Sequence, residues 1–122
     1  MSDMNPRGVK VEICGLTRYL LFTVNAIDEV QTHYGETIYE ILRQMLNDRE
    51  KQFEMTRTVL RILLDAEADR VKLLRGEELR RFTDEEIGML LDVENILDVV
   101  VAIYQAYSIS MPEASEEDDD PN

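Results

Sequence analysis

Few residues in this 122-residue chain could carry out covalent chemistry. The chain has one histidine, His33, and one cysteine, Cys14, and neither stands in a motif that supplies a catalytic partner. A lone helical histidine is most often a surface or half-buried residue, and a lone thiol at the end of a strand is most often inert. Gly76 and Gly88 are isolated, so the sequence contains no glycine-rich phosphate-binding loop. We therefore expect no catalytic residue, no cofactor and no enzymatic activity.

Two acidic clusters are the remaining candidates for a metal site. The acids at positions 84–86 follow Thr83, where helix capping and the helix dipole already explain negatively charged side chains. The run at positions 116–120 lacks the glycine and the alternating ligand spacing of a calcium-binding loop. We expect no metal site. We interpret residues 113–122 as a disordered acidic tail that either keeps the protein soluble or docks basic segments of a partner.

The charge balance of the chain excludes one class of partner. Asp and Glu number 26 and Lys and Arg number 13, so the net charge is −13. Six of the acids lie within residues 113–122, which leaves −7 on the first 112 residues. A surface of this sign repels a phosphate backbone, and we expect no binding to nucleic acid.

One segment reverses this character. Five of the 13 basic residues lie within 12 positions, and acids at positions 69, 77 and 78 neutralise them in part. The segment is either a solvated connection of mixed charge or a contact for an acidic surface, such as the tail of a neighbouring copy. Its basic residues are Arg70, Lys72, Arg75, Arg80 and Arg81.

The length of the chain predicts one domain with a single core. We expect a flexible leader over residues 1–8, which are mostly polar, and a single α+β domain over residues 9–112. The first residues lack the apolar stretch of a signal peptide, and no apolar run approaches the roughly 20 residues of a membrane span. We expect a soluble, cytoplasmic protein without a membrane partner.

The first structured segment has the pattern of a β-hairpin. Val9, Val11 and Ile13 alternate with polar residues, which predicts a strand. Residues 14–17 can turn the chain, and residues 18–24 are rich in aromatic and aliphatic side chains, which predicts a second strand. A lone hairpin is marginally stable, so helices must pack on it.

The rest of the domain has helical patterns with identifiable ends. Asn25 is a plausible N-cap, Thr37 and Thr83 each open a capping box, and Gly35 and Gly76 are suitable stop residues. The sequence therefore predicts an α+β fold in which an N-terminal β-hairpin precedes a bundle of four to five α-helices. The expected helices cover about 25–34, 37–46, 49–74, 83–91 and 92–109.

The last of these helices has an unusually wide apolar arc. Its polar residues fall within roughly 140° of the circumference, and apolar residues fill the rest. One neighbouring helix does not usually cover so wide an arc. The helix is therefore either the central helix of the domain or partly a binding face.

In its order of elements the chain resembles the tail assembly chaperones of long-tailed bacteriophages, notably those of phages and prophages of Gram-positive bacteria. Residues 9–22 resemble the family's opening hairpin, and residues 25–30, followed by Tyr34-Gly35 and Thr37-Ile38, resemble its first helix and glycine break. The likeness covers about residues 9–112. Three further segments carry it: the apolar third helix at 59–64, the threonine–acids–isoleucine–glycine segment at 82–88, and the closing helix at 102–112.

The resemblance implies a non-catalytic role in the cytoplasm of a bacterial host. Such proteins bind the long, helical and aggregation-prone tape measure protein, and keep it soluble while tail tube subunits assemble around it. The implied partners are the tape measure protein, the tail tube protein and a second copy of the chain. Under this hypothesis the partner lies against apolar residues of the hairpin and last helix and against the basic segment. The candidate residues are Tyr19, Leu21, Phe22, Val101, Tyr104, Tyr107, Arg70, Lys72, Arg75, Arg80 and Arg81.

Two other roles fit the composition. The chain could be a structural head–tail joining or tail-tube component, for which assembly into rings would be diagnostic. It could instead be an acidic inhibitor that mimics DNA and binds a host protein. The DNA mimic requires carboxylates spread over a folded face, whereas six acids of this chain lie in the tail and the body carries a basic segment.

Overall fold

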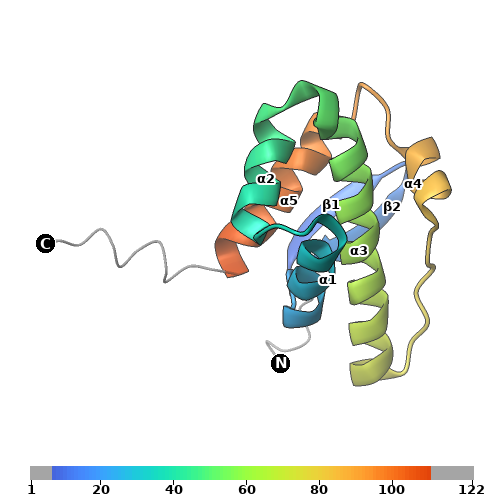
Figure 1. The fold of residues 1–122 in the computed structure, drawn as a ribbon. Coiled ribbons are helices and arrows are strands. Elements are labelled where there is room, and N and C mark those ends of the chain that lie inside the picture. The colour runs from blue at the N-terminus through green and yellow to red at the C-terminus, as the bar shows by residue number, and fades with distance from the viewer. Residues whose placement is uncertain (1–6, 111–122) are drawn as a thin grey trace, which may run out of the picture.

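The computed structural model describes residues 7–110, and the predicted acidic tail at 113–122 lies outside the described residues. An antiparallel two-stranded hairpin is followed by five helices, which confirms the predicted fold class (Figure 1). The elements are β1 (Val9–Ile13), β2 (Leu16–Leu20), α1 (Val24–Tyr34), α2 (Ile38–Asn47), α3 (Arg49–Arg75), α4 (Asp84–Leu90) and α5 (Ile96–Ser110).

The hairpin turns through two residues, Cys14 and Gly15. Both have positive φ angles, 51° and 83°, which is the backbone geometry that matches the right-handed twist of paired strands. This tight turn pairs Ile13 with Leu16 at once, and the register continues to the pair of Val9 with Leu20. The second strand therefore covers Leu16–Leu20 and not the predicted residues 18–24, because the chain needs only two residues to reverse.

The start of α1 also differs from the prediction. Thr23, not Asn25, is the N-cap, and its hydroxyl accepts a hydrogen bond from the Ala26 amide at 3.1 Å. A strand that ends at Leu20 leaves Thr23 free to take the extended backbone that a cap requires. The predicted stop at Gly35 is confirmed by its left-handed φ of 71°.

The two threonines that open capping boxes in the sequence behave differently. At α4, Thr83 accepts from the Glu86 amide at 3.1 Å, and the Glu86 carboxylate accepts from the Thr83 amide at 3.0 Å. At α2, Thr37 accepts from the Glu40 amide at 3.2 Å, but the Glu40 carboxylate accepts from Arg43 instead. Only the α4 box is therefore complete, because a charged neighbour one turn along α2 competes for Glu40.

The longest helix, α3, lies in the middle of the fold. It packs against α1, α2, α4, α5 and β2, and in Figure 1 its C-terminal turns extend below the other elements. Contacts on so many sides bury the apolar side chains in the middle of the helix, between Met55 and Ala68. The buried residues of α3 are Met55, Thr56, Thr58, Val59, Leu60, Ile62, Leu63, Leu64 and Ala68.

A buried arginine attaches the hairpin to α3. Arg18 on β2 donates from Nε to the Glu67 carboxylate at 2.5 Å, and from its two terminal nitrogens to the carbonyls of Leu64 and Arg80. The second carboxylate oxygen of Glu67 accepts from the Tyr19 amide at 3.1 Å. Because each charged group has several partners, this pair joins β2, α3 and the connection between α3 and α4 without leaving the charge unsatisfied.

The last helix begins later than predicted. Residues 92–95 form a turn in which the Asp92 carboxylate accepts from the amides of Glu94 and Asn95, so α5 begins at Ile96. The helix packs against α2, α3, β1 and β2. The helix that contacts most of the other elements is α3, and α5 leaves part of its apolar arc exposed. Only one side of α5 is buried, through Ile96, Val99, Val100, Ala102, Ile103 and Ala106.

Candidate functional site

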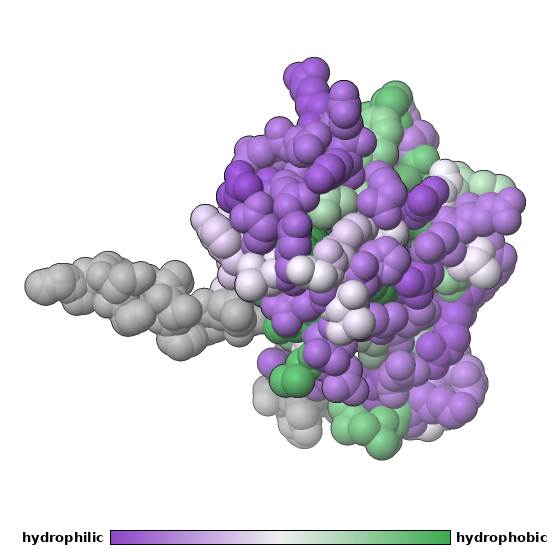
Figure 2. All heavy atoms as spheres, viewed as in Figure 1, coloured by the Kyte–Doolittle hydropathy of each residue, from purple (hydrophilic) through white to green (hydrophobic). Residues whose placement is uncertain are grey.

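Large apolar side chains are exposed in several places within residues 7–110. Most of the face shown in Figure 2 is hydrophilic, with hydrophobic surface near the top of the view and at the lower end of α3. Leu73 and Leu74 are the exposed apolar residues near the end of α3. Others lie on α2 and the start of α3 (Tyr39, Leu46, Phe53), around α4 (Met89, Val93) and along α5 (Leu97, Val101, Tyr104, Ile109).

Three of these residues form a continuous strip on α5. Leu97, Val101 and Tyr104 are 59 %, 53 % and 44 % exposed, and they follow one another at intervals of four and three residues. At 100° per residue, these intervals place the three side chains within about 60° on one face. We call these three residues the α5 strip. It lies opposite the side of α5 that packs into the core, so no element within residues 7–110 covers it.

Of the apolar residues predicted to bind a partner, two belong to the α5 strip and four do not. Val101 and Tyr104 are exposed, whereas Tyr19, Leu21 and Tyr107 are half-buried. Phe22 is only 5 % exposed and packs edge-to-face against Tyr107, with ring centroids 6.3 Å apart. Phe22 therefore supports α5 from within the core, and it presents little surface to a partner.

Leu97 was not among the residues predicted to bind a partner, although the sequence contains a signal for it. The apolar arc of the last helix was identified, but apolarity alone does not distinguish its buried half from its exposed half. The spacing of Leu97, Val101 and Tyr104 is a narrow stripe within that arc, at the repeat that a single partner helix would occupy. The Arg18–Glu67 pair was missed for another reason, because its members lie 49 residues apart.

Three of the five bases in the segment at residues 70–81 form salt bridges with acids in the segment or directly before it. Its salt bridges join Lys72 to Glu78 at 2.9 Å, Arg75 to Glu77 at 3.7 Å and Arg81 to Asp69 at 2.5 Å. Arg80 lies over the Phe82 ring, 5.2 Å from its centroid, and Arg70 is half-buried. These contacts favour the interpretation of a mixed-charge connection, and a contact with an acidic partner stays a prediction.

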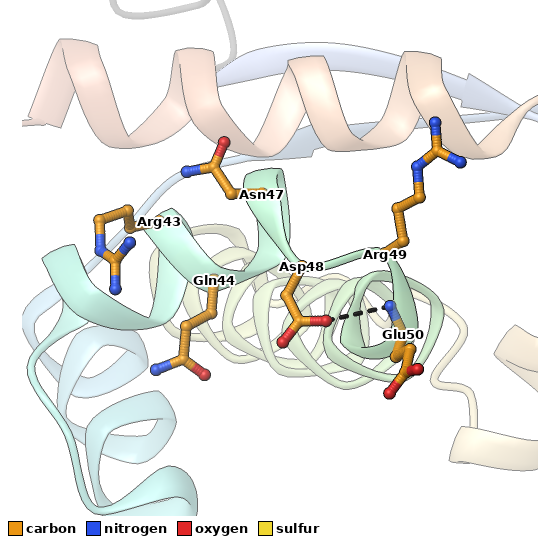
Figure 3. Close-up of a pocket in the computed structure, with 6 residues that line it drawn as sticks. All are labelled: Arg43, Gln44, Asn47, Asp48, Arg49 and Glu50. Carbon is orange, nitrogen blue, oxygen red and sulfur yellow. Dashed lines mark hydrogen bonds between the residues drawn. The ribbon is translucent and has the colours of Figure 1, made fainter.

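Polar residues line a hollow at the junction of α2 and α3. The Asp48 carboxylate accepts a hydrogen bond from the Glu50 amide at 3.0 Å (Figure 3). This bond caps α3, so the role of Asp48 is structural. Gln44 donates to the carboxylates of Glu36 and Glu40. The hollow is therefore explained by the turn between α2 and α3, and we propose no ligand for it. Its lining residues are Arg43, Gln44, Asn47, Asp48, Arg49 and Glu50.

The two residues with potential for covalent chemistry lie apart. Cys14 is exposed at the hairpin turn, with Sγ 3.6 Å from the Leu90 carbonyl oxygen. His33 is exposed on α1, and its ring packs edge-to-face against Tyr34 at 4.6 Å. Among residues 7–110, no three His, Cys, Asp or Glu side chains are grouped so that they could hold a metal ion.

Comparison with known protein families, curated proteins and solved structures finds no match to this chain. No helix in the described part of the chain is both long enough and apolar enough to cross a membrane.

Proposed function

We propose that this protein is a tail assembly chaperone that binds an apolar helical segment of the tape measure protein and keeps it soluble during tail assembly. The α5 strip carries the proposal, because a protein that holds an apolar client needs apolar surface that its own fold leaves uncovered. The resemblance of residues 9–112 to the chaperone family supports the same role. The net charge of −13 would keep the complex with such a client in solution.

Co-expression tests this role directly. The protein is produced with fragments of the tape measure protein from the same phage or prophage, and the soluble fraction of each fragment is measured with and without it. We expect at least one fragment to become soluble and to co-purify with the protein. Unchanged insolubility of every fragment would rule out the chaperone role.

A pair of matched variants locates the client. Leu97→Ser combined with Val101→Ser removes the apolar character of the α5 strip, and we expect it to abolish co-purification. Leu73→Ser combined with Leu74→Ser makes a similar change at the exposed end of α3, and we expect it to leave co-purification intact. If instead only the Leu73→Ser, Leu74→Ser variant loses co-purification, the client binds the exposed end of α3.

The two rival roles give different results in the same purification. A structural tail component would elute as a closed ring without a tape measure fragment. An acidic DNA mimic would retain a DNA-binding host protein, and it would lose that protein at high salt.

A further inference from the structure

We infer that the α5 strip binds one amphipathic α-helix of a partner protein whose apolar stripe is flanked by Lys and Arg. This inference rests on the proposed function, because it specifies the chemistry of the segment that the chaperone would hold. Two independent observations carry it: the spacing of the exposed apolar residues and the distribution of charge around them.

The spacing indicates a helical occupant. Leu97, Val101 and Tyr104 follow the alternation of four and three residues that forms the seam of paired helices, and the next position of this repeat is Ser108, which is also exposed. A seam of this width accommodates the side chains of a single helix. Val93 is 80 % exposed in the turn that precedes α5, so a further apolar side chain is exposed just before the helix begins.

Acids and bases are divided unevenly along the chain. Twelve of the 26 acids and none of the 13 bases lie after Arg81, which leaves 14 acids and 13 bases in residues 1–81. The C-terminal third of the chain therefore carries nearly the whole net charge. Six of its acids belong to the described residues: Asp84, Glu85, Glu86, Asp92, Glu94 and Asp98.

Two of these acids lie close to the α5 strip. Asp98 is exposed and directly follows Leu97, so it borders the strip on α5 itself. Glu94 is exposed in the turn that leads into the helix. Neither carboxylate forms a salt bridge with another residue of the described range 7–110. Both are therefore available to pair with a cationic partner.

One base lies on the same side of the molecule. Arg49, at the junction of α2 and α3, points toward α5 in Figure 3. Arg49 is one positive charge, against the two carboxylates of Glu94 and Asp98. A helix with basic flanks would place its apolar stripe on the α5 strip and its charges beside those carboxylates.

The same charge distribution argues against two other occupants. A second copy would bring an α5 with the same acids and no base, so the contact would lack the charge complementarity that a basic helix offers. The chain's own residues 113–122 carry six acids and no base, and they lack this complementarity for the same reason.

Synthetic peptides test the inference without the natural client. Three helical peptides share one apolar stripe and differ only in the flanking residues, which are Lys and Arg, Gln, or Glu. Binding to the full chain is measured by fluorescence anisotropy at low and at high salt. We expect the basic peptide to bind about tenfold more tightly than the acidic peptide, a difference that corresponds to about 1.4 kcal/mol. High salt should shrink this difference, because the flanking charges are exposed.

Variants separate docking on the strip from general attraction to an acidic protein. Leu97→Ser with Val101→Ser keeps every charge, and we expect it to abolish binding of the basic peptide. Leu73→Ser with Leu74→Ser should leave that binding unchanged. Glu94→Gln with Asp98→Asn should reduce the preference for the basic peptide, and deletion of residues 113–122 should retain it. A circular dichroism spectrum of each variant verifies that it is folded.

Several outcomes would overturn the inference. These are equal binding of the basic and acidic peptides, unchanged binding to the Leu97→Ser, Val101→Ser variant, and no binding of any peptide. If the tape measure protein is still kept soluble in these cases, only the stated chemistry of the partner fails. If the basic peptide binds the strip but no tape measure fragment becomes soluble, the chaperone role fails and the binding surface stands.

Discussion

Two helices of this protein carry broad apolar arcs, and their surroundings differ. Neighbours surround α3, which contacts four helices and β2, so Leu60, Leu63 and Leu64 are fully or almost fully buried. Neighbours contact only one side of α5, so Leu97 and Val101 remain exposed on the other. The apolar content of a helix thus does not determine its burial. Burial depends on which sides of the helix the neighbouring elements cover.

The polar residues of the two helices show the same difference. Three charged residues of α3 bind other elements: Glu54 binds Tyr34, Arg61 binds Asp84, and Glu67 binds Arg18. On α5, Asp98 has no salt bridge within residues 7–110. The helix in the middle stabilises the fold through both its apolar and its charged side chains. The outer face of α5 carries exposed apolar side chains instead.

The largest expected effect concerns the buried charge pair on α3. Arg18→Ala leaves the Glu67 carboxylate buried without its cation, and we expect the free energy of unfolding to fall by about 3–5 kcal/mol. Urea denaturation measures this loss. A double variant, Arg18→Met with Glu67→Leu, should be less destabilised than Arg18→Ala, because no isolated charge remains. A loss below about 1 kcal/mol for Arg18→Ala would mean that the pair behaves as a surface salt bridge.

The same substitution in both helices tests the difference most directly. Leu63→Ala creates a cavity beside α3, and we expect it to lower the free energy of unfolding by about 2–5 kcal/mol. Leu97→Ala removes a side chain that is largely in solvent, so we expect a change of about 0.5 kcal/mol or less. Thermal or urea unfolding of the two variants side by side gives the comparison. A similar loss for both leucines would show that the α5 strip is buried in solution.

The smallest expected effect is a pH dependence at the contact between α1 and α3. Burial of the Tyr34 phenol, aided by the Glu54 carboxylate that accepts its hydrogen bond, raises the pKa of Tyr34 from 10.0 to about 12. The folded state therefore holds this proton more tightly than the unfolded state. The resulting stability is complete below pH 10 and is lost as the pH rises toward 12.

Tyr34→Phe isolates this contribution. Between pH 10 and 12 the variant should lose less stability than the unaltered protein, as measured by urea unfolding at several pH values. When tyrosinate absorbance is titrated, the variant should also lack the component with the raised pKa that Tyr34 gives in the unaltered protein. Identical pH dependence in the two proteins would mean that the contact with Glu54 does not hold the proton.

Local rules account for the parts of the fold that the sequence predicted. Alternation of apolar and polar residues identified β1, and left-handed glycines marked the ends of α1 and α3 at Gly35 and Gly76. The threonine at position 83 and the acid three residues later identified the start of α4. Each of these features depends on residues within a few positions of one another, so one stretch of sequence contains all the information.

The boundaries that were predicted wrongly depend on a choice between two local possibilities. Thr23 and Asn25 are both good N-caps, and the tight turn at Cys14-Gly15 decided between them by ending β2 early. Asp92 and Asn95 could have continued the last helix, but their side chains close a turn before it.

By itself the sequence determined the fold class, the order of the elements and the wide apolar arc of the last helix, because periodicity and capping are properties of adjacent residues. Only the tertiary structure decided which half of that arc is exposed and which arginine is buried. Arg18 meets Glu67 across 49 positions, and α2, α3, β1 and β2 together cover only one side of α5. Burial is a property of the surrounding elements, and packing brings those elements together from distant parts of the chain.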